Sequence, residues 1–152
     1  PYLDPFLRGS YTGIQSGHGK AHFTRATLEG VAFSLRDCME AIQKLDMKMD
    51  RVKIIGGGAK GALWRQIVSD VLDLRLEKVK VDDSSFGSAM LAAVGIGWFS
   101  DFEEAVQCCV EIDSVTEPEK EQCQIYRVLF EKYREIHDAL EKIYHKYGVG
   151  DR

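Results

Sequence analysis

The sequence predicts an α/β protein whose helices pack on a small, mixed and partly parallel sheet. Segments with apolar residues every three or four positions alternate with short apolar or alternating segments, and a triple glycine joins a strand at residues 52–55 to a helix. This order of elements favours helices that cover a partly parallel sheet. Hydrophobic residues make up 45% of the 152 residues and charged residues 29%, which fits one globular domain over residues 1–152.

The apolar periodicity predicts five helices. The first covers about residues 22–45, and the last follows a turn at residues 117–118. Shorter helices are expected over residues 60–72, 86–95 and 101–109. Each long helix is expected to bury one apolar stripe. The stripes are Leu28, Val31, Leu35, Cys38, Ile42 and Leu45 on the first helix, and Ile125, Leu129, Tyr133, Ile136, Leu140 and Ile143 on the last.

Three short segments predict strands. Residues 10–14 and 75–81 alternate polar and apolar side chains, and residues 52–55 form a short apolar run. Three strands are few for a sheet that carries this many helices. We therefore expect the sheet to be incomplete.

Charge and cysteine content exclude several classes of protein. The formal net charge of −4 and the isoelectric point near 5.6 argue against a surface for nucleic acid or anionic membrane. No apolar run approaches the roughly 20 residues of a membrane span. The four cysteines have no CxxC spacing, which indicates reduced thiols in a cytoplasmic protein. The chain opens with Pro1 rather than Met, as expected of a fragment.

The chemistry concentrates at residues 54–61 (Ile-Ile-Gly-Gly-Gly-Ala-Lys-Gly). Three glycines between a strand and a helix let the backbone approach a ligand, and the start of the helix offers free N–H groups to a phosphate or a polar nucleotide edge. The spacing matches neither the GxxxxGK[ST] loop nor the GxGxxG loop. From the residues alone, a tight turn and a ligand-binding loop both remain open.

Other candidate site residues have simpler explanations. The four histidines are dispersed, without HExxH and without a carboxylate at ligand spacing, which indicates surface or capping roles and no metal site. Asp82 and Asp83 have the composition of a metal site, yet helix capping explains them equally well. Glu29 lies on the first helix, where its side chain could face a functional site, but a solvated or capping carboxylate is the simpler interpretation.

Several spaced motifs occur in one order along the chain. They are residues 9–14 (Gly-Ser-Tyr-Thr-Gly-Ile), 22–30 (His-Phe-Thr-Arg-Ala-Thr-Leu-Glu-Gly), 56–59 (Gly-Gly-Gly-Ala), 64–66 (Trp-Arg-Gln), 70–72 (Asp-Val-Leu) and the small-residue helix at 86–93. Together, over about residues 1–107, they resemble the downstream signature of the FGGY carbohydrate kinase family.

The resemblance implies the C-terminal part of a ribonuclease H-like domain of the actin-like ATPase type, the nucleotide-binding half of a two-domain kinase. It also implies transfer of the γ-phosphoryl group of ATP, with Mg²⁺, to a sugar or polyol hydroxyl. The amino-acid sequences of the glycine loop and of residues 64–66 are most similar to those of xylulose kinases. Gluconate and glycerol kinases remain open.

The resemblance also assigns the site residues. It carries Gly56, Gly57, Gly58 and Ala59 over as nucleotide contacts, and Gly61 stands where relatives often have Ser or Asn. The catalytic Asp, the phosphate-binding hairpin and most sugar contacts belong to parts upstream of Pro1. We therefore expect no catalytic residue in this chain, no activity of the isolated chain, and a sugar bound through the missing N-terminal domain. Because an incomplete sheet leaves strand edges unpaired, we also expect the chain to form a homodimer or to need its other half for solubility.

Two other classes of function stay open at this stage. One is a non-catalytic nucleotide-binding or regulatory module that uses the same loop without a partner domain. The other is an interaction protein whose long C-terminal helix docks a partner and whose glycines serve only the turn.

Overall fold

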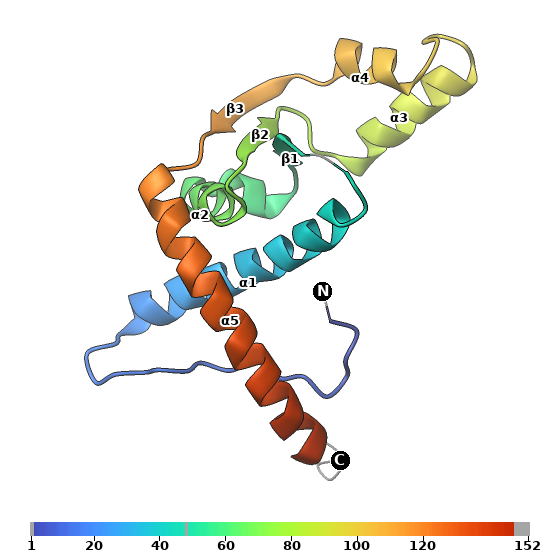
Figure 1. Ribbon diagram of the computed structural model, residues 1–152. Helices are drawn as coiled ribbons and strands as arrows, with labels where there is room; N and C mark the ends of the chain where they lie inside the picture. The colour runs from blue at the N-terminus through green and yellow to red at the C-terminus, as the bar shows by residue number, and fades with distance from the viewer. Residues whose placement is uncertain (1, 48, 148–152) are drawn as a thin grey trace. The chain divides into compact units, whose positions relative to one another are not determined.

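The computed structural model describes residues 2–47 and 49–147, and Figure 1 gives the order of their elements. The helices are α1 (Lys20–Gln43), α2 (Ala62–Leu72), α3 (Ser84–Gly95), α4 (Phe102–Cys109) and α5 (Lys120–Tyr147), with a short 3₁₀ helix, η1 (Gly57–Lys60). The strands are β1 (Arg51–Ile54), β2 (Arg75–Val79) and β3 (Ile112–Thr116). The five expected helices are confirmed, with ends shifted by a few residues.

The described residues form two compact units. One contains residues 2–47, 70–73 and 119–147, and therefore α1, α5 and the segment before α1. The other contains residues 49–69 and 74–118, with the sheet and the helices around it. Among the described residues, no helix combines the length and the apolar character that crossing a membrane requires.

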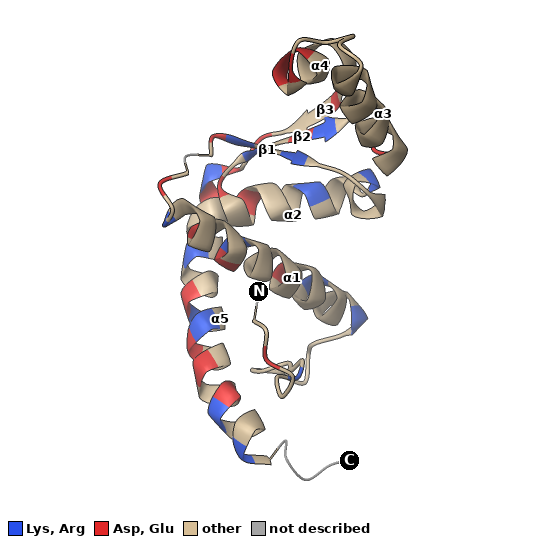
Figure 2. Cartoon of the chain, turned by 90° about the vertical axis from the view of Figure 1, so that its right-hand side faces the viewer, with Lys and Arg blue, Asp and Glu red and all other residues tan. Residues whose placement is uncertain are grey.

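The sheet has the order β1-β2-β3 and is mixed, as expected. Strand β1 pairs with β2 in parallel, with Arg51 opposite Arg75, and β2 pairs with β3 antiparallel. Parallel neighbours need a crossover connection, which here is η1 and α2. Helix α2 lies on one side of the sheet, whereas α3 and α4 lie on the other (Figure 2).

One predicted strand is wrong, and one observed strand was missed. Residues 10–14 pair with no strand in the described part of the chain; instead the Tyr11 hydroxyl bonds Thr27 Oγ1 (2.5 Å), and its ring packs edge-on against Phe23 of α1. Strand β3 lacked a clear signal because it is a short edge strand. Its Ile112 and Val115 are about two-fifths exposed, so the burial that gives a strand its alternating pattern is weak.

The predicted stripes on the two long helices match their covered faces only in part, since Leu28 on α1 and Leu129, Tyr133 and Leu140 on α5 are half-buried. On α1 the chain buries Ala32 and Phe33, whereas the expected Val31 and Leu35 are 49% and 42% exposed. On α5 the buried residues are Cys123, Tyr126 and Phe130, whereas the expected Ile125, Ile136 and Ile143 are exposed. Periodicity groups residues on a face, but it does not identify which face a partner covers.

Aromatic rings join α1 to α5. The ring of Phe33 lies 5.4–6.0 Å, between centroids, from those of Tyr126, Phe130 and Tyr133. The guanidinium of Arg36 lies over the Phe130 ring at 4.4 Å. Aromatic contacts of this kind stabilise a packed pair of helices beyond the area they bury.

A polar contact completes this packing. The Tyr126 hydroxyl donates to Glu29 Oε1 (2.9 Å) and accepts from Arg25 Nη2 (2.6 Å), and Arg25 Nε donates to Glu29 Oε1 (2.7 Å). Tyr126 is 1% exposed, so its hydroxyl depends on these partners. Burial, with Glu29 adding to it and Arg25 opposing it, raises the pKa of Tyr126 to about 12.

We predict that Tyr126→Phe lowers the free energy of unfolding by about 1–3 kcal/mol, because the charged Arg25 and Glu29 each lose a hydrogen bond to a buried group. Urea unfolding measures this change. Tyr133→Phe is the matched control, since no hydrogen bond of its hydroxyl occurs among the described residues. Equal losses in both variants would contradict a specific role for the Tyr126 hydroxyl.

Candidate functional site

The glycine loop lies where the two parallel strands end. Gly56 follows β1, Asp82 follows β2, and the carboxyl ends of parallel neighbours share one edge of the sheet. The Gly56 N–H donates to Asp82 Oδ2 at 3.1 Å, which joins the two strand ends directly. Ligands bind open α/β sheets at this kind of edge.

The three consecutive glycines have different structural roles. Gly56 has a φ of +83°, a backbone conformation that residues with a Cβ rarely adopt. A Cβ on Gly58 would lie 2.9 Å from Nε1 of Trp64, so the indole covers that position. A Cβ on Gly57 would meet nothing within 4 Å, and φ at Gly57 is not in the positive region. The fold of this chain therefore requires Gly56 and Gly58 but not Gly57.

Ala59 supports the loop from inside. It is 1% exposed, its N–H donates to Gly56 O (3.0 Å), and its carbonyl accepts from Arg65 Nη1 (2.6 Å). Gly61 has extended dihedral angles (φ −80°, ψ 115°), and its carbonyl accepts the Arg65 N–H at 3.1 Å. Gly61 thus has the N-cap position of α2, but without a side chain that could cap.

The loop presents unpaired donors to the surface. In the described part of the chain, the N–H groups of Gly57 and Gly58 have no hydrogen-bond acceptor, and both residues are exposed. Helix α2 begins at Ala62, just beyond them, and the first N–H groups of a helix lack acceptors within the helix. Free N–H groups beside the positive end of a helix dipole suit a phosphate or another anionic or polar group.

The acidic residues beside the loop are already engaged. Asp83 is the N-cap of α3 and accepts the Ser85 N–H at 2.7 Å. Hydrogen bonds from the Ser85 hydroxyl and from this N–H lower the pKa of Asp83. Asp82 holds Gly56. The capping interpretation of Asp83 is thus confirmed, and Asp82 has a role in the turn that the sequence did not reveal.

Two of the histidines act as local acceptors, as expected. His22 Nδ1 accepts the Gly19 N–H at the start of α1, and His18 Nδ1 accepts the Gln15 N–H, both at 3.2 Å. Their rings stack with centroids 5.0 Å apart.

A hollow forms where two of the sequence motifs meet. It is open, has a volume of about 280 Å³, and is lined by Tyr11, Thr12 and Ile14 on one side and by α1 residues including Arg25 and Glu29 on the other. Residues 9–14 and 22–30 therefore lie together in space. Because Glu29 bonds Tyr126 and Arg25, it serves the packing of α1 on α5 as well as lining this hollow.

Comparison with known proteins assigns the family. The model of the FGGY family of carbohydrate kinases, C-terminal domain, matches residues 1–96, nearly two-thirds of the chain. The chain belongs to the FGGY family. Its ribonuclease H-like fold, with five α-helices and a three-stranded mixed sheet among the described residues, agrees with this membership.

Individual FGGY relatives differ in their substrates. The xylulose kinase of Staphylococcus epidermidis is 36% identical over 143 residues, and the glycerol kinase of Saccharolobus islandicus is 41% identical over 106 residues. These alignments cover 93% and 68% of this chain. The crystal structure of gluconate kinase from Lactobacillus acidophilus is 29% identical, with a TM-score of 0.87 over 95% of this chain. The chain spans 28%, 21% and 29% of the three FGGY kinases, respectively.

The roles of the three glycines predict that alanine substitutions lower the free energy of unfolding by different amounts. Gly58→Ala should lower the free energy of unfolding by about 1–3 kcal/mol, because the indole of Trp64 must move. Gly56→Ala should cost about 1–2 kcal/mol through its positive φ. Gly57→Ala, the matched control, should stay within about 0.5 kcal/mol of the original. Urea denaturation tests the order, and a Gly57→Ala loss as large as that of Gly58→Ala would contradict it.

Proposed function

We propose that this chain supplies one wall of the ATP site in a sugar kinase of the FGGY family, with residues 1–152 as the C-terminal portion of its second, nucleotide-binding domain. The proposal rests on the surroundings of Gly57. Two of the three glycines are explained by the fold, whereas Gly57 has open space at its Cβ position and an N–H without an acceptor among the described residues. A glycine that the chain itself does not require suits a surface where a ligand approaches the backbone.

The proposed contacts differ among the loop residues. Gly57 and Gly58 offer N–H groups to the nucleotide, Gly56 and Ala59 hold the loop in shape, and Gly61 lies at the start of α2. Mg²⁺ would accompany ATP and neutralise its phosphates. Asp82 holds the turn at Gly56 and Asp83 caps α3, and we assign no Mg²⁺ ligand to this loop.

We propose the parent enzyme to be xylulose kinase-like. The support is the xylulose kinase of S. epidermidis, which is 36% identical over 93% of this chain. Glycerol and gluconate kinases are also similar, which indicates that this part of the family is shared among enzymes with different substrates. Choice of the sugar would then depend on residues outside this chain. We propose a cytoplasmic location for the enzyme.

Two exposed features support self-association or docking of the rest of the parent protein. The β1 edge away from β2 has no strand partner in the described residues, and unpaired edges favour pairing with another strand. Helix α1 exposes a stripe that includes Val31, Leu35 and Ile42. The isolated chain is therefore proposed to form a homodimer, or to require the remainder of the kinase for solubility.

In the full-length kinase, Gly57→Val should raise KM for ATP at least about tenfold, while KM for the sugar changes less than about twofold. The added side chain occupies space that the fold leaves empty, and tenfold corresponds to about 1.4 kcal/mol. Steady-state kinetics with each substrate varied separately measures both constants. The control is Gly95→Val, at another exposed glycine with nothing within 4 Å of its Cβ position. Equal losses for ATP and sugar in a folded Gly57→Val enzyme would contradict the proposed contact.

The isolated 152-residue chain should not consume ATP in the presence of a sugar. Phosphoryl transfer needs groups that converge on both substrates, and loss of a general base alone costs about 10²–10⁴ in rate. A coupled assay with xylulose, gluconate and glycerol tests this expectation. Turnover within about tenfold of an ordinary kinase (roughly 1–100 per second) would mean that the chain contains a catalytic base.

The alternative function is a non-catalytic nucleotide-binding or regulatory module. Full-length protein that binds ATP but transfers no phosphate to any sugar of this panel would favour that alternative.

A further inference from the structure

The C-terminal half of α5 carries a polar face that the nucleotide site does not use. His137, Glu141 and His145 recur at intervals of four residues, which places them on one side of the helix. The segment before α1 lies along this side. Tyr2 stacks on His137 with ring centroids 3.8 Å apart, and Phe6 packs edge-on against His145 at 5.3 Å.

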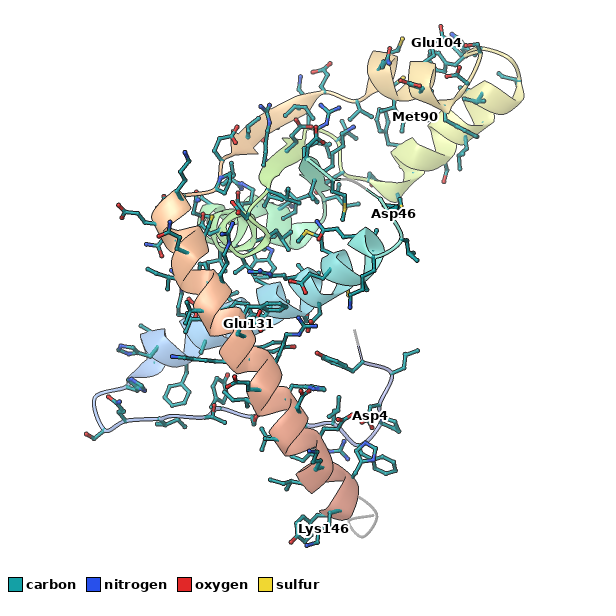
Figure 3. All side chains as sticks on the ribbon, in the orientation of Figure 1. Asp4, Asp46, Met90, Glu104, Glu131 and Lys146 are labelled. Carbon is teal, nitrogen blue, oxygen red and sulfur yellow. The ribbon has the colours of Figure 1, made fainter. Side chains whose placement is uncertain are left out.

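Asp4 lies between these two aromatic contacts and faces α5 (Figure 3). Its Oδ2 lies 2.6 Å from Nε2 of His145, while its Oδ1 accepts the N–H of Phe6 at 2.9 Å. The backbone hydrogen bond orients the carboxylate, so that Oδ2 points at the helix. The Phe6 ring restricts His145 in the same way.

Glu141 completes the group. One ligand atom from each of Asp4, Glu141 and His145 lies within 4.8 Å of the other two. Glu141 is half-buried, and among the described residues its carboxylate has no hydrogen bond or ion pair. Two carboxylates therefore share one small space, beside the imidazoles of His145 and His137, which could carry a compensating positive charge. Like charges this close are unfavourable, and a cation between them would relieve the repulsion.

We propose that Asp4, Glu141 and His145 form a site for a divalent transition-metal ion of the Zn²⁺ type. Two carboxylate oxygens and one imidazole nitrogen are ligands that Zn²⁺ accepts, at about 2.0–2.2 Å each. Three protein ligands leave a fourth position for water, which His145 permits because its side chain is 49% exposed. The ion would replace the hydrogen bond between His145 and Asp4, so these two atoms must separate by only a fraction of an ångström.

The ion would have a structural consequence. Asp4 and His145 are 141 positions apart in the sequence, and a shared ion would fasten the segment before α1 to the last third of α5. Binding to the folded chain alone stabilises it by mass action. No residue of the glycine loop takes part, so nucleotide binding and metal binding should be separable.

Isothermal titration of the 152-residue chain with ZnCl₂ tests the proposal. We expect one saturable site per chain, and a rise in the melting temperature when Zn²⁺ is added. Glu141→Gln and His145→Ala should each weaken binding by about tenfold or more and remove the thermal shift, with helix content by circular dichroism unchanged. Glu141→Gln is the sharper variant, because among the described residues Glu141 has no hydrogen bond or ion pair whose loss would disturb the fold.

His18→Ala is the matched control, since His18 and His22 form a separate stacked pair at the surface. Binding that survives in Glu141→Gln and His145→Ala but is lost in His18→Ala would place the ion at the other pair and overturn the proposal. So would the absence of saturable binding up to about 1 mM Zn²⁺, which corresponds to a binding free energy weaker than about −4 kcal/mol.

Discussion

Parallel pairing of β1 with β2 is the constraint on which the candidate site depends. Two parallel neighbours cannot be joined by a tight turn, so the chain must leave the end of β1, cross a face of the sheet and return to the start of β2. Helix α2 makes this crossover, and its start must lie close to the end of β1. The reversal from strand to helix takes place in the glycine loop, with Gly56 in a left-handed conformation. The free N–H groups of the loop follow from this geometry.

The contacts within the fold explain two of the three glycines in the loop and leave the third for a ligand. Gly56 is held by Asp82, which follows the neighbouring strand, and Gly58 makes room for the indole of Trp64. Gly57 makes no such contribution. Elsewhere in the chain, the hydroxyl of Tyr126 joins Arg25 and Glu29, so polar residues of the family signature serve packing. A motif that identifies a family therefore contains structural and ligand-facing residues together, and only the contacts separate them.

The sequence predicted the helices and the two parallel strands because each follows from a local pattern. It did not predict which face of α1 is covered, since Val31 and Leu35 have the right spacing but remain exposed. Strand β3 was missed because its pairing with β2, rather than its own composition, creates it. The glycine loop was found from the sequence, but the different roles of Gly57 and Gly58 required the position of Trp64. The cluster at His145 was missed because Asp4 is distant in sequence, although the four-residue spacing from Glu141 was a usable signal.

The most direct test of the account is to record which backbone amides respond when ATP is titrated into the isotope-labelled chain. Two-dimensional ¹H–¹⁵N spectra detect weak binding as well as strong binding. The account predicts that the largest chemical-shift changes occur at the exposed N–H groups of Gly57 and Gly58 and at the start of α2, with little change at Asp4 and His145. Changes centred on another surface, with the glycine amides unmoved at saturating ATP, would contradict the assignment of this loop to the nucleotide.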